Sequence, residues 1–333
     1  MKLALNSMKI MLALMVMLAA SMACTADDRY AEGAFDRTLK TSGAVDLTVE
    51  TVSGSISVHA GDGSSVHVSA KIRVSEGWHV TMSEAEAKVK KLEANPPIEQ
   101  SGNTIRIGEI RDEDLRRNVS ISYEISTPAD TKLRSSTGSG SQTLDGLKGP
   151  VETSTGSGSI HLSKISSDVH ATTGSGTITL DAVNGSVRAS TGNGGIHANG
   201  IAGGVTAKTG SGTVEISQTA PGDVDVETGS GGVDLRGVQG RVRVHAGSGS
   251  LHAEGKPTGD WDLHTASGSV TLRLPADAGF ILEASSGSGN ITTTHEMTVT
   301  GQIGGNRHEV HAKVRGGGPV ISAHTSSGSI RVE

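Results

Sequence analysis

The sequence predicts an all-β protein, a parallel β-solenoid preceded by a small β-rich region that contains one short helix. Three observations support this fold class. A glycine-rich motif returns every 18 residues, apolar residues alternate with polar ones on both sides of it, and aromatic residues make up only 2% of the 333 residues. A core without large rings must be assembled from Val, Ile, Leu and Ala, while many of the 46 glycines stand at corners.

The recurring motif reads TGSGS at 137–141 and 155–159, TGSGT at 173–177 and 209–213, and TGNGG at 191–195. Internal repeats near 20 residues are typical of solenoids, in which each unit buries its apolar face only by stacking on its neighbours. We interpret the motif as a corner, because glycine adopts backbone angles closed to other residues and Ser and Thr side chains hydrogen-bond turn backbones. The predicted corner glycines are Gly138, Gly140, Gly156, Gly158, Gly174, Gly176, Gly192, Gly194, Gly210 and Gly212.

Apolar residues flank each corner with a period of two, which predicts strands. Those four residues before a motif threonine are Leu133, Val151, Val169, Val187 and Val205, and those that open the next strand are Ile160, Ile178, Ile196 and Val214. Identical residues at whole-repeat spacing favour parallel coils, with an antiparallel meander of GSG hairpins as the alternative. The segment 133–333 has room for about eleven coils at ~4.8 Å each, a rod of roughly 50 Å.

Other interpretations of the glycine motif fit less well. A phosphate-binding loop needs Gly-Lys-Ser/Thr at the start of a helix, and the motif has no lysine. A calcium-binding nonapeptide roll needs an aspartate that TGSGS, TGSGT and TGNGG all lack. A disordered linker is excluded by the regular apolar positions between the motifs.

The first 23 residues predict a secretory signal peptide, with Lys2 and Lys9 before the apolar run IMLALMVMLAA and small residues at 21–23. Cys24, the only cysteine, follows directly and has no disulfide partner. Its place resembles a bacterial lipobox, which makes Cys24 a lipidation candidate and the membrane a partner through that anchor. Ordinary signal-peptidase cleavage, which leaves a soluble protein, is the alternative.

The rest of the chain is predicted in three parts. Residues 24–40 are expected to form a linker, 41–132 a β-rich part with one helix near 83–94, and 133–333 the repeat solenoid. The helix is expected to begin with a capping box of Ser83 and Glu86. LTVETVSGSISV at 47–58 is an outlying copy of the repeat, and RDEDLRR at 111–117 is expected as a solvated loop.

The segments SISYEISTPADTKLRSSTGSGS and VETVSGSISV, together with the TGSGxI/V units, resemble DUF4097, a bacterial family of adhesin-like β-strand-repeat proteins of unknown function. The resemblance covers about residues 40–333. The resemblance implies a β-solenoid that is located in the cell envelope. It supplies no catalytic residue.

The outward positions of the strands carry charged residues and histidines in rows. On the strands before the corner they read Glu152, His170, Arg188, Thr206, Asp225, Arg243 and Asp262. The run Asp225–Arg243–Asp262 predicts a ladder of ion pairs rather than a general acid/base pair, because an arginine separates the carboxylates. His245, His264 and His324 share one row position and His161, His197 and His252 another, without a third ligand at fixed spacing that would indicate a metal site.

These observations predict a non-catalytic envelope protein, an adhesin-like surface or periplasmic interaction scaffold without a cofactor. Its partners would be envelope polysaccharide or another protein, and the net charge of −6 argues against nucleic acid. A glycan-acting enzyme that uses a solenoid face is the first alternative. An envelope-stress sensing component is the second.

Overall fold

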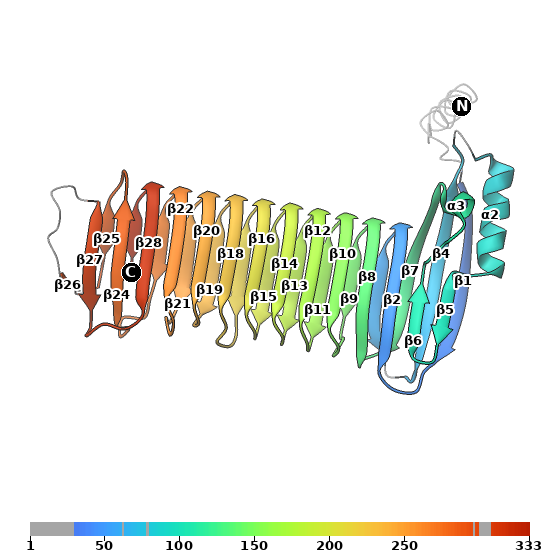
Figure 1. Ribbon diagram of the computed structural model, residues 1–333, viewed down its shortest axis with the longest axis horizontal. Coiled ribbons are helices and arrows are strands. Elements are labelled where there is room, and N and C mark those ends of the chain that lie inside the picture. The colour runs from blue at the N-terminus through green and yellow to red at the C-terminus, as the bar shows by residue number, and fades with distance from the viewer. Residues whose placement is uncertain (1–29, 62, 78–79, 296, 300–307) are drawn as a thin grey trace, which may run out of the picture.

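Two long sheets stand face to face and run the length of the molecule (Figure 1). The computed structural model describes residues 30–61, 63–77, 80–295, 297–299 and 308–333. Sheet A has the strand order β1-β4-β7-β3-β9-β11-β13-β15-β17-β19-β21-β23-β29-β25, and sheet B the order β26-β27-β24-β28-β22-β20-β18-β16-β14-β12-β10-β8-β2-β6-β5.

Each repeat contributes one strand to each sheet, and equivalent strands pair in parallel. Val151 lies beside Val169 in sheet B, and Ile160 lies beside Ile178 in sheet A. This confirms the parallel β-solenoid and excludes the antiparallel meander for the repeats. The sheet B strands are β8 (Thr131–Ser139), β10 (Val151–Ser157), β12 (Val169–Ser175), β14 (Val187–Asn193), β16 (Val205–Ser211), β18 (Val224–Ser230), β20 (Val242–Ser248) and β22 (Trp261–Ser267). Their sheet A partners are β9 (Gln142–Asp145), β11 (Ile160–Ile165), β13 (Ile178–Val183), β15 (Ile196–Ile201), β17 (Val214–Gln218), β19 (Val233–Val238), β21 (Leu251–Gly255) and β23 (Val270–Arg273).

The core is a narrow apolar layer between the two sheets. Alternate residues of every strand point into it, and the valines, isoleucines and leucines there are almost completely buried. Trp261 takes an inward slot that a valine holds in the neighbouring coil, and its indole N–H donates to the carbonyl oxygen of Gly240 at 3.1 Å. A large ring is therefore accepted in this layer where its polar atom finds a partner.

A buried threonine links its coil to the preceding one at most of the glycine corners, whereas Oγ1 of Thr228 is buried without a hydrogen bond. The hydroxyl of Thr155 donates to the carbonyl oxygen of Gly140 at 3.1 Å, and that of Thr173 donates to Gly158 at 3.0 Å. Equivalent bonds join Thr137 to Gly54, Thr191 to Gly176, Thr209 to Gly194, Thr265 to Gly249 and Thr325 to Gly268. The motif threonine thus satisfies a backbone carbonyl at each corner that has this bond, which a buried acceptor requires.

The second glycine of the motif has a backbone conformation that other residues rarely adopt. Gly158 has φ 149°, and a methyl group on it would lie 2.2 Å from the carbonyl oxygen of Gly140 in the preceding coil. Gly140, Gly176, Gly194 and Gly212 repeat this arrangement. The first glycine is also closely stacked, since a methyl group on Gly156 would lie 2.6 Å from the carbonyl oxygen of Gly138.

The N-terminal part supplies the first coil and a cap. β2 (Val45–Ser53) and β3 (Ile56–Gly61) form this coil, in which Thr51 lies beside Thr137 although 86 residues separate them. The outlying repeat copy therefore stacks directly on the main array. The cap is built from β1 (Tyr30–Lys40), β4 (Ser65–Ser75), β5 (Ile98–Ser101), β6 (Thr104–Ile107) and β7 (Val119–Pro128), where antiparallel pairs replace parallel ones.

Three expectations for this part need correction. Residues 30–40 were expected in a linker, but they form β1, which pairs with β4 along its whole length and buries Ala31 and Phe35. The capping box of α2 (Met82–Ala94) is Thr81 and Glu84 rather than Ser83 and Glu86, and the hydrogen bond from the backbone N–H of Thr81 lowers the pKa of Glu84. The loop expected at 111–117 contains one helical turn, α3 (Glu113–Arg116), with Asp112 as its N-cap.

Helix α2 covers the outer side of the cap beside β1 and β4 (Figure 1). Its Ala85, Val89 and Leu92 are buried. The carboxylate of Glu93 accepts a hydrogen bond from the backbone N–H of Ala34 in β1 at 3.0 Å. The helix thus occupies part of the edge at which another strand could pair. Among the described residues, neither helix has the length and apolar character needed to cross a membrane.

The last coil lies inside the stack rather than at its end. β28 (Val320–Ser327) and β29 (Ile330–Val332) pair with β22 and β23 on one side, and with β24 (Phe280–Ser286) and β25 (Ile291–Thr293) on the other. β26 (Met297–Val299) and β27 (Glu309–Val314) then extend sheet B beyond β24 in antiparallel fashion. From β8 onward the described residues form ten coils against the roughly eleven expected, because β26 and β27 extend sheet B without adding strands to sheet A.

We expect Gly158→Ala to destabilise the solenoid by at least about 1–3 kcal/mol. The alanine would have to adopt a positive φ that residues other than glycine rarely adopt, and its methyl group would lie too close to the carbonyl oxygen of Gly140. Chemical denaturation followed by circular dichroism measures the effect. Ser157→Ala, at the neighbouring exposed position, should leave the denaturation midpoint almost unchanged. Equal midpoints for both variants would contradict the account of the corner.

We expect Thr173→Val to cost about 1–3 kcal/mol, because a side chain of nearly the same shape removes the hydrogen bond to Gly158 and leaves its carbonyl oxygen unpaired. The outward-facing Thr172→Val makes the same chemical change without breaking an inter-coil bond. A loss of stability in the Thr172 variant as large as in the Thr173 variant would show that the buried hydroxyl is not the cause.

Candidate functional site

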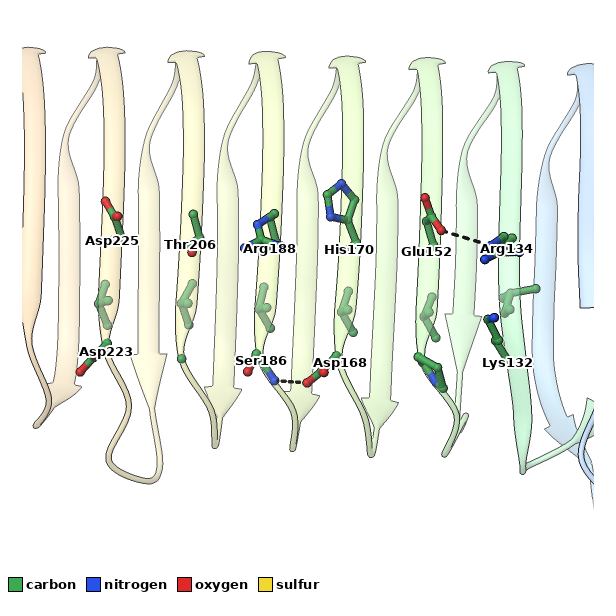
Figure 2. Close-up of a pocket in the computed structure, with 18 of the residues that line it drawn as sticks. Lys132, Arg134, Glu152, Asp168, His170, Ser186, Arg188, Thr206, Asp223 and Asp225 are labelled. Carbon is green, nitrogen blue, oxygen red and sulfur yellow. Dashed lines mark hydrogen bonds and ion pairs between the residues drawn. The ribbon is translucent and has the colours of Figure 1, made fainter. Parts of the chain in front are cut away.

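A shallow groove of about 600 Å³ runs along the outer face of sheet B and crosses seven successive coils, from β8 to β20. Three columns of residues line it (Figure 2). The first column forms one wall. Its residues stand directly before the inward apolar residue of each strand, and all but Lys132 belong to the corners: Lys132, Pro150, Asp168, Ser186, Gly204, Asp223 and Arg241. The other wall comprises Arg134, Glu152, His170, Arg188, Thr206, Asp225 and Arg243.

Strand alternation produces this shape. In each strand the residues directly before and after the inward apolar residue point outward. These outward residues form the two walls of the groove, and the strip of apolar residues between them forms its floor. The strip is Leu133, Val151, Val169, Val187, Val205 and Val224, whose side chains are buried in the core. Because the coils repeat in register, the walls stay parallel over the full length of the groove.

Most carboxylates of the groove already have partners. Glu152 accepts a hydrogen bond from Arg134 at 3.3 Å. Asp168 accepts one from the backbone N–H of Ser186 at 2.8 Å, a bond drawn in Figure 2, and Asp223 accepts one from the backbone N–H of Arg241 at 2.9 Å. These two hydrogen bonds stabilise the fold, because each fixes the corner of the following coil.

Four cations of the groove have no ion pair within 4.0 Å among the described residues. They are Lys132, Arg188, Arg241 and Arg243. The unpartnered carboxylate is Asp225, of which Oδ1 is buried without a hydrogen bond. The groove lining carries five cationic side chains and four carboxylates, a small positive excess on a chain whose net charge is −6.

The ladder expected for Asp225, Arg243 and Asp262 is not formed. The three residues are in register on adjacent coils, as predicted, but no ion pair within 4.0 Å joins them in the described structure. Exposed pairs gain too little to fix long side chains in one geometry. An ion pair between adjacent coils forms instead in the next row, where Lys208 donates to Glu227 at 2.8 Å, and this hydrogen bond raises the pKa of Lys208.

The outer face of sheet A has a smaller hollow of about 210 Å³. Glu215 and Asp234 lie side by side there on neighbouring coils. Each is already engaged, since Glu215 lies 3.1 Å from Nδ1 of His197 and Asp234 accepts a hydrogen bond from Arg236 at 2.7 Å. The repeat spacing predicts this row with Thr, Glu and Asp between its histidines, and the structure places these residues side by side.

The two predicted histidine rows are present. His161, His197 and His252 lie in one row of sheet A with Thr, Glu and Asp between them. His245, His264 and His324 lie in one row of sheet B, where the intercalated coil makes all three consecutive. Within the described ranges, no three His, Cys, Asp or Glu side chains are gathered closely enough to hold a metal ion. Cys24 lies outside the described residues.

The groove itself was not foreseen from the sequence. Its outer wall is the row that begins with Glu152, which the period of two identifies. The column from the corners was missed, because residues such as Pro150, Ser186 and Gly204 share no chemical type and the loose corners vary in length. Only their common position, two residues before the wall, carries the signal.

Comparisons with known proteins bear on the fold. No curated protein matches the chain. Among solved structures, a putative cell adhesion protein from Clostridium sporogenes is 12% identical with a TM-score of 0.21, over 91% of this chain and 99% of that one. A putative lipid binding protein from Parabacteroides distasonis is 13% identical with a TM-score of 0.37, over 90% and 97%. A putative adhesin from Bacteroides fragilis is 10% identical with a TM-score of 0.26, also over 90% and 97%.

A family model described as Toastrack DUF4097 matches residues 128–333, more than half of the chain. The match covers the repeat array with its threonine-glycine corners, the intercalated last coil and the seven-coil groove. With this match added to the parallel coils described above, the chain belongs to the Toastrack DUF4097 family.

Proposed function

We propose that the protein is a non-catalytic scaffold of the cell envelope that binds an extended anionic polysaccharide in the groove of sheet B. The single observation that carries this proposal is the extent of the groove, which is lined by equivalent positions of seven successive coils. Six intervals of ~4.8 Å give it a length of roughly 29 Å. A straight groove of this length suits a linear polymer better than a compact small molecule.

The charge of the groove argues for an anionic polymer. Lys132, Arg188, Arg241 and Arg243 are exposed and have no carboxylate partner in the described structure. Of the four groove carboxylates, Glu152 pairs with Arg134, while Asp168 and Asp223 accept hydrogen bonds from backbone N–H groups and keep their charge. Guanidinium groups bind carboxylates through two parallel hydrogen bonds. A polymer with a carboxylate or sulfate on successive sugars would therefore meet several donors along the groove.

A glycan-acting enzyme remains the second candidate, and one observation favours it. Glu215 and Asp234 are neighbouring carboxylates in the hollow of sheet A, the arrangement from which acid/base pairs are built. Their engagement with His197 and Arg236 supports a structural role instead. We rank binding above catalysis for this reason.

We expect the double substitution Arg188→Ala and Arg243→Ala to weaken binding of polygalacturonate about three- to tenfold, because two exposed charge contacts of about 0.3–0.7 kcal/mol each are lost. Isothermal titration calorimetry at low and high salt measures the affinity, and added salt should weaken wild-type binding through screening. Arg331→Ala, an exposed arginine on sheet A, is the matched control.

Equal binding of an uncharged glucan, or an equal loss in the Arg331 variant, would overturn the choice of ligand and groove. Shortening of the polymer during incubation with wild-type protein, abolished by Glu215→Gln, would instead establish the enzyme.

We also propose that the protein is exported and anchored to the membrane through Cys24. The basis is the apolar run that precedes this cysteine. In cells, Cys24→Ser should move the protein from the membrane fraction to the soluble fraction and abolish labelling by a fatty-acid analogue. Thr25→Ser is the control and should keep both properties. Membrane retention of the Cys24 variant without label would refute the anchor.

A further inference from the structure

Three histidines form a continuous row on the outer face of sheet B. His245 is in β20, His264 in β22 and His324 in β28, and each lies beside the next in register. The ring centroids are 6.0 Å apart for His245 and His264 and 6.4 Å apart for His264 and His324, with the rings tilted by 52° and 51°. The row exists because β28 enters the stack next to β22.

The ring nitrogens of this row are free for a ligand. No hydrogen bond or ion pair engages any of the three rings in the described structure. Several other imidazoles are engaged, since His197 contacts Glu215, His67 contacts Asp36 and His311 contacts Glu309. The row thus combines close neighbours with unused donor atoms.

The two ends of the row differ in charge. Arg243 lies two residues before His245 on the same face, and Glu227 on the adjacent coil is held by Lys208. Asp262 lies two residues before His264, and Glu283 faces the coil of His324, where its carboxylate accepts a hydrogen bond from Ser322 at 3.4 Å. A cation is therefore favoured at the His264–His324 end and repelled at the His245 end.

We propose that this row is a surface site for a divalent transition metal ion, Cu²⁺, Ni²⁺ or Zn²⁺, held principally between His264 and His324. Neutral imidazole is a preferred ligand of these ions, with metal–nitrogen distances of about 2.0–2.1 Å for zinc. Two tilted rings on adjacent strands reach one ion by small rotations about their side-chain bonds.

The proposed site uses two protein ligands, with water in the remaining positions. No group of three His, Cys, Asp or Glu side chains in the described residues is already gathered around one point, so a closed three-ligand site is not what the geometry offers. His264 stands in the middle of the row and is shared. The row consequently binds one ion at a time, with His245 as the weaker alternative partner.

Titration of the full chain, without a polyhistidine tag, with CuCl₂, NiCl₂ or ZnCl₂ in a calorimeter tests the site. We expect one ion per molecule and the tightest binding for Cu²⁺. His264→Ala should reduce the affinity at least tenfold, and His324→Ala should reduce it more than His245→Ala. His252→Ala is the matched control, because this histidine lies on sheet A between Asp234 and Thr271.

Unchanged binding in the His264 variant, or an equal loss in the His252 variant, would overturn the proposal. Circular dichroism of each variant excludes unfolding as the cause of any loss. Light scattering during the titration measures the molecular mass. A metal-dependent doubling of the mass would show that the ion bridges two copies, and it would overturn a site within one molecule.

Discussion

The contact between successive corners is the constraint on which the structure depends. A threonine hydroxyl of one coil donates to a glycine carbonyl of the coil before it, and the glycine above lies too close to that carbonyl to carry a side chain. The threonine–glycine contact forms in one strand register only. The apolar core favours the same register, because a shift by a single residue would turn every apolar side chain outward. Fixed register in turn gives straight outward rows, so the groove walls and the histidine row are both columns of the repeat.

Sequence periodicity predicts most of the fold for this reason. The alternation identifies the inward residues of both sheets, and the match of 47–58 to the repeat anticipates a coil that pairs far along the chain. The start of α2 was misplaced because Thr81 and Ser83 each have a glutamate three residues later, so both fit a capping box. β1 was missed because only two of its side chains, those of Ala31 and Phe35, are fully buried, which leaves a weak pattern.

The position of the last coil could not be predicted, because every coil offers its neighbours the same pairing edge. The ion pairs between charged side chains were equally hard to predict. Arg243 is in register with two aspartates yet pairs with neither, since exposed ion pairs gain too little to order such side chains. Rows are therefore predictable from the repeat, whereas the contacts within a row and the corner column of the groove require the structure. The proposed ligands rest on those contacts.

The intercalated coil also bears on the order in which the molecule is completed. A chain that emerges from its N-terminus can add the coils from β8 to β23 one after another, each on the last. The coil of β28 and β29 is synthesised after β24, yet it separates β22 from β24 in the finished stack. The final arrangement therefore cannot exist until residues 320–332 are available, and a chain that stops before them has no means of building the native far end.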